Sequence, residues 1–427
     1  MVAVVSVISI VAYILSLIRF SNKWVEQQIV FLLIYLIGLT AIGELDVLLP
    51  IYFVVTLLPF LKYIRRISAF TAIIAVYFGA YLIYGLINQN PTGTLVTFVA
   101  KMWQFIVFFI VYDAEIYVEE ENYKGIINVA VIFETLLGLY LMATSTNMDV
   151  NGLVRLVSNS QPITGNISTV ILPIVAYFYF EKRRENGQTR WLLFMSLIML
   201  AWIVLSGTRG YTLEFAATMF LIIYDYFVNG DVSAASRKNR LIILVLLGMG
   251  FFVCAIAVPE IYEKLESVLR VKASVGIRTF ENAATKEFFR NTSLFTEFLG
   301  VGLGGQGGKN PAMREALYRQ FSLGMWDRQH YLYDCGALFH NLYANVLMCM
   351  GAIGMIMVVF INIEIWKRVS YSCSGRKLIG TVMHLFQLSF LLMNYYRWSA
   401  VCGIAEMILF ALILKRLEND NEILCED

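Results

Sequence analysis

Charged residues are scarce in this sequence. Only 15% of its 427 residues are Asp, Glu, Lys or Arg, while 59% are hydrophobic. A soluble protein typically has about 25% charged and about 45–50% apolar residues. The 33 basic residues are scattered along the chain and nearly balance the 31 acidic ones, which argues against a nucleic-acid partner. The composition therefore excludes an ordinary soluble domain.

Residues that build metal or disulfide sites are also few. No pair among the six cysteines has the spacing of a zinc site, and the histidines are His330, His340 and His384. No Asp-x-Asp pair stands where a catalytic metal would be expected. We therefore expect no metal and no cofactor. Residues 1–18 are apolar but lack a basic leader and a small-residue cleavage site, so we interpret them as a first membrane span.

Long apolar runs recur along nearly the whole chain. A helix needs roughly 20 apolar residues to cross a bilayer, whereas barrel strands alternate apolar and polar residues. The pattern predicts an all-α polytopic integral membrane protein with about 12–14 transmembrane helices and one large external loop containing amphipathic helices. We expect N-terminal helices in 1–258, the loop in 259–337, and C-terminal helices with a cytoplasmic tail in 338–427. The runs lie at about 2–18, 29–42, 47–61, 67–87, 95–112, 126–143, 167–180, 191–205, 211–228, 241–258, 338–365, 378–393 and 399–414.

The distribution of Lys and Arg predicts the orientation. If the connections alternate between the two sides, one set holds 19 basic residues and the opposite short connections hold only three, Arg155, Arg209 and Arg397. Basic residues favour the cytoplasmic side, and long loops cross regardless of charge. The large loop and the segments around Arg155 and Arg209 therefore share the outer face, where substrates must arrive already activated. The basic-rich set comprises 19–28, 62–66, 113–125, 181–190, 229–240, 366–377 and the tail from 415.

Two outer segments are rich in glycine. Residues 300–308 contain a formal G-x-G-x-x-G match, but a dinucleotide site needs a preceding strand within a βαβ unit. A tight turn that uses positive φ is the simpler interpretation, and a close backbone approach to a substrate is another. Residues 205–211 join two spans and carry Arg209, which either reaches lipid headgroups or has a functional role.

Residues 276–291 have the pattern of an amphipathic helix. Ile277, Phe280, Ala284 and Phe288 form one stripe, and Arg278, Asn282, Lys286 and Arg290 lie on roughly the opposite face. Such a helix lies on a membrane surface, either as a plain anchor or with its basic face over an anionic headgroup.

His340 stands at the start of the next span, close to the outer face. A histidine there can take a proton near neutral pH. His384 falls within a span and is better explained as a hydrogen-bonded core residue. Ionisable residues inside spans usually face the bundle interior. They are Lys101, Glu134, Glu214, Glu364 and Glu406, with Glu134 or Glu214 as candidate partners of Lys101.

These segments, in this order, resemble the O-antigen polymerase and O-antigen ligase family. Ser206–Gly210 is similar to the S-[GR]-x-R-G turn of that family. Arg278 followed by Gly-Val-Gly-Leu-Gly at 300–304 is similar to its R…G-x-G-x-G segment.

Two further motifs extend the resemblance over about residues 155–354. His340-Asn341-x-Tyr343 with the Gly-Ala-Ile-Gly run at 351–354 resembles the H-N-x-[YF]…G-x-x-G segment of the family. Arg155 with Gln-Pro at 161–162 and Gly-Asn at 165–166 resembles the arginine and Pro/Asn motif of the preceding loop.

The resemblance implies a fold like that of C-type membrane glycosyltransferases, in the bacterial cytoplasmic membrane. It implies a metal-independent, inverting transfer of a glycan from undecaprenyl diphosphate on the periplasmic or external face. Arg209 and Arg278 would stabilise the diphosphate and His340 would be the base, with Asp327 or Asp334 as the alternative base. The substrate-binding residues would be Arg155, Asn166, Arg290, Gly302, Gly304, Asn341 and Tyr343.

Within that family we favour a repeat-unit polymerase for O-antigen or capsule. Its partners would be undecaprenyl-diphosphate-linked oligosaccharide, membrane lipid and a chain-length regulator. A ligase that transfers the glycan to lipid A–core shares the same motifs and is the nearest alternative. A flippase or proton-coupled carrier is a different class, for which the sequence lacks the internal repeat common in transporters.

Overall fold

The computed structural model describes helices and short turns, with no strand in the described part of the chain. The chain divides into two compact units, Met1–Ala130 with Ile277–Asp427, and Val131–Gly276. We refer to them as unit 1 and unit 2. The structure describes residues 60, 63–64, 66–90, 92–114, 116–144, 166–185, 189–206, 218, 220, 281–283, 285–286, 288–290, 292–305, 341–396 and 400–426.

The helices follow the predicted apolar runs, with ends that differ by a few to about a dozen residues. Among the described residues, α14 and the helical residues 281–290 have no counterpart among those runs, because they lie in the predicted large loop. Two of the described helices, α4 and α17, are long and apolar enough to cross a membrane by length and composition. The helices are α4 (Ala69–Ile87), α5 (Thr92–Asp113), α6 (Glu120–Thr144), α8 (Asn166–Arg184), α9 (Arg190–Ser206), α14 (Leu294–Leu299), α17 (Leu342–Ser372), α18 (Lys377–Tyr396) and α19 (Ala400–Glu426).

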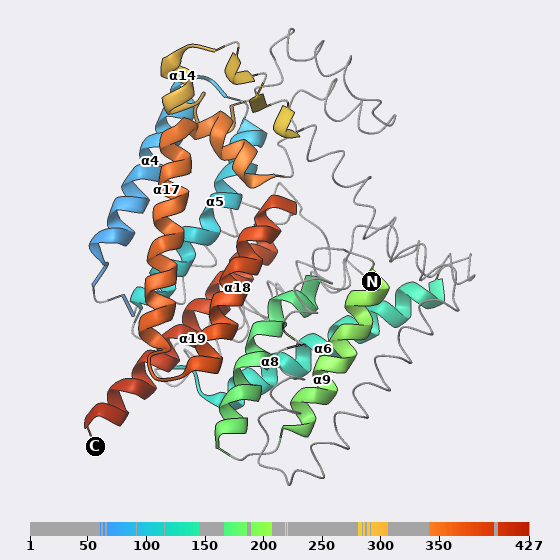
Figure 1. Cartoon of the computed structure of the whole chain (residues 1–427). Helices are drawn as coiled ribbons and strands as arrows, with labels where there is room; N and C mark the ends of the chain where they lie inside the picture. The colour runs from blue at the N-terminus through green and yellow to red at the C-terminus, as the bar shows by residue number, and fades with distance from the viewer. Residues whose placement is uncertain are drawn as a thin grey trace. The chain divides into compact units, whose positions relative to one another are not determined.

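In unit 1, α5 packs along α19, and α17 lies against α14, α18 and α19 (Figure 1). At one end, which we call the arginine end, the start of α4 meets the ends of α5 and α17, because Ser68 N–H donates to Asp113 and Arg368 pairs with Asp113. At the other, the glycine end, Asn90 after α4 bonds to residues 301 and 303. The connections 62–66, 113–125 and 366–377, all assigned to one side by their charge, adjoin the arginine end.

Local sequence explains where α4 begins and ends. Ser68 is its N-cap, since its Oγ accepts the Thr71 N–H at 3.2 Å. An N-cap oxygen satisfies one of the backbone donors that a helix start leaves unpaired. The helix ends at Asn88, and Gln89 then takes a positive φ of 54° ahead of Pro91, which cannot continue a helix.

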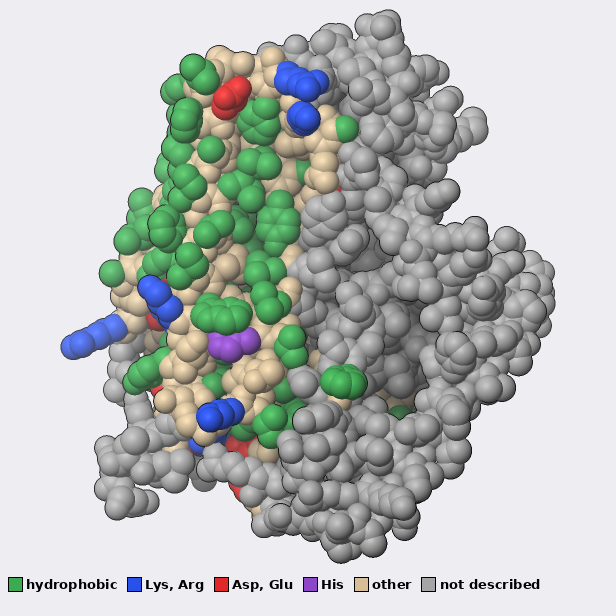
Figure 2. All heavy atoms as spheres, viewed as in Figure 1, with side chains coloured by type: hydrophobic (Ala, Val, Ile, Leu, Met, Phe, Trp, Pro, Cys, Tyr) green, Lys and Arg blue, Asp and Glu red, His purple; other side chains and the backbone are tan. Residues whose placement is uncertain are grey.

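One face of unit 1, formed by α4 and α17, exposes many large apolar side chains. Val76 is 72% exposed on α4, and Ile356 and Phe360 are 54% and 55% exposed on α17. Figure 2 shows hydrophobic side chains over the middle of this face and charged side chains toward its two ends. Soluble monomers rarely expose apolar patches larger than a few hundred Å². Such a band is what lipid-facing helices present.

Two of the predicted intramembrane ionisable residues of unit 1 are buried, as expected. Lys101 on α5 and Glu406 on α19 are 4% and 3% exposed. Beside them, Gln104 donates to Asn394 of α18 at 3.0 Å, and Gly403 lets α19 approach the Gln104 amide. The core between α5, α18 and α19 therefore contains a group of polar side chains around Gln104.

His384, predicted as a hydrogen-bonded core residue, is hydrogen-bonded between α17 and α18 but is only partly buried, so the core part of the prediction is wrong. Its Nε2 lies 3.2 Å from the Ser370 hydroxyl oxygen, and its ring stacks on Trp366 at 3.8 Å. These contacts give His384 a packing role between the two helices.

Unit 2 brings α8 and α9 together with residues 131–144 of α6. Glu134, fully buried, accepts the Ser168 N–H at 3.4 Å and also the Ser168 hydroxyl. Ser168 lies in the first turn of α8, where unpaired N–H groups and the helix dipole favour a negative charge. These bonds hold the buried Glu134 carboxylate. Lys101 belongs to unit 1, so its predicted pairing with Glu134 stays a prediction. Glu214, the other candidate partner of Lys101, lies outside the described residues.

Candidate functional site

The described part of the chain contains six of the ten predicted site residues. Asn166 is the first residue of α8, in unit 2. Arg290, Gly302, Gly304, Asn341 and Tyr343 all belong to unit 1. The other four, Arg155, Arg209, Arg278 and His340, lie outside the described residues, as do Asp327 and Asp334.

The glycine segment, residues 300–305, has the positive φ that its sequence predicts. Gly300, Gly302 and Gly304 have φ of 71°, 86° and 72°. A side chain is strained there because Cβ approaches the backbone. A Cβ at Gly304 would also lie 2.4 Å from the Cα of Leu95 on α5. The glycines therefore allow the segment to bend and to touch the helices around it.

Polar side chains after α4 hold the carbonyl groups of the glycine segment. Asn90 Nδ2 donates to Val301 O at 3.0 Å and to Leu303 O at 2.9 Å. Asn88 Nδ2 also donates to Val301 O, at 3.0 Å, and Tyr84 Oη donates to Gly300 O at 3.3 Å. These residues were not among the predicted site residues, although Asn-Gln-Asn-Pro at 88–91 is a typical turn composition.

The same segment fills a break in α17. Gly351 has non-helical φ and ψ of 62° and −161° inside this helix. A break of this kind leaves carbonyl groups without their helical partners. Val301 N–H donates to Met348 O at 3.0 Å, and Gly302 N–H donates to Cys349 O at 2.9 Å.

A tyrosine from α4 completes the break. Tyr81 Oη donates to the next carbonyl, Met350 O, at 3.2 Å. Gly351 itself lies so close to α14 that a Cβ there would be 2.4 Å from the carbonyl carbon of Phe298. The Gly-x-Gly-x-Gly and Gly-x-x-Gly segments are therefore two halves of one packed junction.

These contacts test the three interpretations of the glycine segment, namely a dinucleotide-binding turn, a tight turn and a close approach to a substrate. The segment follows α14, a helix, so the strand that a dinucleotide-binding turn requires does not precede it. Gly302 and Gly304 are buried against α4 and α5. Their contacts in the structure are with the chain itself, and substrate binding by them stays a prediction.

Asn341 caps α17. Its Oδ1 accepts the N–H of Tyr343 at 2.9 Å and of Ala344 at 3.4 Å. Its own N–H donates to Glu281 Oε2 at 3.1 Å, and its Nδ2 donates to Asn282 Oδ1 at 3.2 Å. Asn341 is only 2% exposed, so it joins the helical residues 281–282 to the start of α17.

Tyr343 ties the start of α17 to α18. Its hydroxyl donates to Leu391 O at 2.6 Å. This bond gives the tyrosine of the His-Asn-x-Tyr motif a structural role, and its contact with a substrate stays a prediction.

The helical residues 281–290 bear out the predicted exposed face. Asn282, Lys286 and Arg290 are exposed and Phe288 is buried. Arg290 thus lies on the exposed face of this stretch, and its binding to a substrate stays a prediction. The sequence analysis missed Glu281, which is fully buried. Its position seven residues before Phe288 puts both on one helix face and was the available signal.

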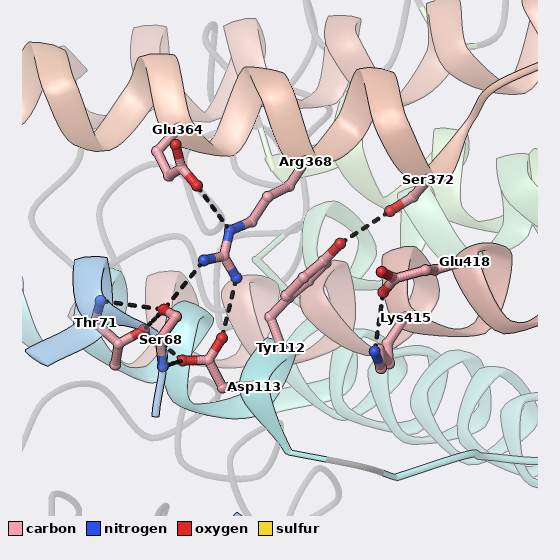
Figure 3. Close-up of polar contacts among 9 residues, drawn as sticks. All are labelled: Ser68, Thr71, Tyr112, Asp113, Glu364, Arg368, Ser372, Lys415 and Glu418. Atoms are coloured by element: carbon pink, nitrogen blue, oxygen red, sulfur yellow. Dashed lines mark hydrogen bonds and ion pairs between the residues drawn. The ribbon is translucent and has the colours of Figure 1, made fainter. Parts of the chain in front are cut away.

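A second polar network lies at the arginine end (Figure 3). The Arg368 guanidinium contacts Asp113 at 3.2 Å, Glu364 at 3.4 Å and the Ser68 hydroxyl at 3.3 Å. It also lies 4.4 Å from the ring centroid of Tyr112, a cation–π distance.

This network joins α4, α5 and α17 through one arginine. Asp113 also accepts the Ser68 N–H at 2.8 Å and the Thr71 hydroxyl at 2.6 Å, so the carboxylate is fully engaged. Glu364, one of the ionisable residues expected to face the bundle interior, has Arg368 as a partner and is partly exposed. Because Arg368 and Asp113 contact other groups of the protein, this network is better explained as holding α4, α5 and α17 together than as a substrate site.

Among the described residues, no group of His, Cys, Asp and Glu is arranged to hold a metal ion. A scan against protein-family models and a search of curated proteins both find no match to this chain. The family resemblance therefore depends on the motifs and their order.

Proposed function

We propose that this chain is a polyprenyl-diphosphate-dependent glycosyltransferase of the bacterial cytoplasmic membrane. It polymerises lipid-linked repeat units of an O-antigen or capsule. The growing glycan leaves its undecaprenyl diphosphate and joins the non-reducing end of the next unit on the external face.

The junction at the glycine end is the observation that carries the proposal. It brings together the segments 300–305 and 341–354, two of the four motifs on which the resemblance depends. Arg290 is exposed on the helical residues that contact Asn341. Sequence order and spatial proximity thus agree for these two motifs.

The membrane location has separate support. The apolar band on α4 and α17 fits lipid, with charged side chains at both ends (Figure 2). The connections 62–66 and 366–377, which hold three and four of the 19 basic residues assigned to the cytoplasmic side, adjoin the arginine end, so the glycine end would face outward. A lipid-linked donor would reach the junction from the bilayer.

The chemistry needs a clamp for the leaving group and a base. Arginine forks bind phosphate oxygens at two points and stay charged, so Arg209 and Arg278, with Arg155, would stabilise the departing diphosphate. His340 would take the proton of the acceptor hydroxyl, which is worth about 10²–10⁴ in rate. The anomeric C–O bond to diphosphate breaks as the bond to the acceptor oxygen forms.

A direct assay tests the proposed function. Purified protein in detergent is mixed with lipid-linked repeat units from the same strain, with EDTA present, and the products are resolved on a gel. We expect a ladder of increasing chain length. Transfer only onto added lipid A–core would identify a ligase instead. Translocation of the substrate in vesicles without any covalent product would identify a carrier.

Two variants test the residue assignments. Arg278→Lys keeps the charge but loses the fork, so transfer should fall at least about tenfold. His340→Ala should lose about 10²–10⁴ in rate. Arg270→Lys and His330→Ala, in the same predicted loop, are the matched controls and should retain transfer. Turnover by Arg278→Lys or His340→Ala at the level of its control would refute that assignment.

A further inference from the structure

The exposed stripe of α17 changes from apolar to polar toward the arginine end. Its apolar part includes Ile356, Phe360 and Ile363, and the same stripe continues with Lys367 and Tyr371, at spacings of three or four residues. Side chains with this spacing lie on one face of a helix. A helix that passes from the acyl chains of a bilayer into its headgroups shows this change.

Two aromatic side chains mark the level of the change. Trp366 and Tyr371 are 42% and 62% exposed on α17. The Trp366 ring stacks on His384 of α18, with 3.8 Å between the ring centroids, so the indole is held in place at the surface. Trp and Tyr are enriched where a membrane meets water, because the ring is apolar and its N–H or O–H group is polar. The headgroup region therefore lies at this part of α17.

Three exposed cations at the arginine end have no carboxylate partner. Arg66, Lys367 and Lys377 are exposed, and none of them forms an ion pair in the described part of the chain. Arg368, which is more buried, contacts Asp113 at 3.2 Å. The charges of the three exposed cations are thus left for a partner outside the chain.

These cations border the apolar band of α4 and α17. Arg66 lies two residues before Ser68, the N-cap of α4, whose hydroxyl oxygen is 3.3 Å from the Arg368 guanidinium. Lys367 directly precedes Arg368 on α17, and Lys377 is the first residue of α18. Figure 2 shows basic side chains beside the end of the hydrophobic band that lies lower in the view. The band and the cations therefore form one continuous surface.

We propose that this surface binds anionic phospholipids of the cytoplasmic leaflet. Arg66, Lys367 and Lys377 neutralise the negative headgroups, Trp366 and Tyr371 lie at the headgroup level, and the acyl chains cover the apolar band. Basic residues near a membrane surface attract anionic lipids, while their stems lie along apolar groups. The inference uses the membrane location alone and does not depend on the proposed reaction.

A second copy of the chain fits this surface less well. In a two-fold dimer the same patch meets itself, so the three cations of one copy would approach the three of the other. Like charges that meet across an interface oppose association. An anionic lipid, in contrast, supplies the opposite charge and the apolar chains in one molecule.

The experiment measures quenching of Trp366 fluorescence by brominated lipid. The full chain is placed in phosphatidylcholine nanodiscs that contain a rising fraction of brominated phosphatidylglycerol or of brominated phosphatidylcholine. The chain has seven tryptophans, so the Trp366 signal is the difference between wild type and Trp366→Phe. Brominated phosphatidylglycerol should reach half-maximal quenching at a mole fraction at least about tenfold lower than brominated phosphatidylcholine.

Charge-removing variants test the cations. Lys367→Gln should raise the mole fraction of phosphatidylglycerol at half-maximal quenching about fivefold, and the triple variant with Arg66→Gln and Lys377→Gln should lose the preference. Lys124→Gln is the matched control. Lys124 also lies in a connection predicted to be cytoplasmic, but its ammonium is already 2.9 Å from the Glu120 carboxylate. If the triple variant fails to fold, the three single variants provide the test.

The outcomes are distinct. A preference for phosphatidylglycerol that the triple variant loses and Lys124→Gln keeps supports the proposal. Equal quenching by the two lipids, a preference that survives in the triple variant, or an equal loss in Lys124→Gln would refute it. If neither lipid quenches Trp366, protein covers the surface, and a doubled particle mass would identify a second copy. The assay uses no glycan substrate, so its result is independent of the proposed function.

Discussion

Two glycines of α4 offer a direct test of the junction at the glycine end. A Cβ added at Gly79 would meet nothing within 4 Å. A Cβ at Gly85 would lie 2.4 Å from Leu303 O and 2.9 Å from Leu303 N. Alanine has a higher helix propensity than glycine by about 1 kcal/mol, so both substitutions share the same intrinsic gain. Any difference between Gly79→Ala and Gly85→Ala therefore reports the contact with the glycine segment.

The expected loss of stability in Gly85→Ala follows from the hydrogen bonds that must break when Leu303 moves. Leu303 cannot move aside freely, because Asn90 holds both Val301 O and Leu303 O. Asn88 and Tyr84 add two further bonds to the segment. At about 1 kcal/mol for each hydrogen bond, and with two or three of these four bonds lost, we expect Gly85→Ala to weaken the attachment by about 2–3 kcal/mol.

Cys349 provides the assay. It is fully buried beneath the segment, and its thiol donates to Gly305 O at 3.5 Å. In a background with the other five cysteines replaced by serine, maleimide labelling of Cys349 reports local opening. Labelling of Gly85→Ala should be about 30- to 150-fold faster than labelling of Gly79→Ala. Equal labelling rates and equal Tm values for the two variants would refute the described packing.

Three further predictions concern stability and reactivity. Asn341→Ala removes the N-cap of α17 and should lower unfolding free energy by about 0.5–2 kcal/mol, measured by denaturation in detergent, and Asn341→Asp should recover part of the loss. Arg368→Met should cost about 3–5 kcal/mol by removing the ion-pair partner of Asp113, and Asp113→Asn should relieve part of that cost. Additive effects in the double-mutant cycle would contradict the pairing. Burial raises the pKa of the Cys373 thiol to about 12. Its alkylation in the folded protein should therefore be slow at pH 8 and rise about tenfold per pH unit toward that pKa, whereas a rate that levels off near pH 9 would contradict this burial.

Hydropathy located the helices well, because a helix that faces lipid must be apolar along most of its length. It did not locate the break in α17, since Gly351 stands inside an otherwise continuous apolar run. Glycine within an apolar run is common, and the sequence holds no local signal that separates a packed glycine from a broken helix. The break in α17 depends on its tertiary contact with the glycine segment, which the local sequence does not encode.

The site was predicted in part. Positive φ at Gly302 and Gly304 followed from the glycine pattern. The exposed face of Asn282, Lys286 and Arg290 followed from the amphipathic spacing of residues 276–291. The partners Asn88 and Asn90 could not be predicted. They lie about 210 residues before the groups that they bind, and no sequence spacing encodes such a contact.

The junction explains why these motifs occur together. Water does not reach a buried carbonyl group that has lost its helical partner, so such a group must find a donor in the protein. Gly351 frees carbonyl groups in α17, and the N–H groups of Val301 and Gly302 take two of them. Those two N–H groups can approach the helix only if the segment has glycines that tolerate positive φ and close contact. A substitution of Gly351 that restored a straight helix would leave the glycine segment without its partners. The two glycine motifs therefore form one structural element, whose geometry holds the start of α17 and the predicted loop in a fixed relation.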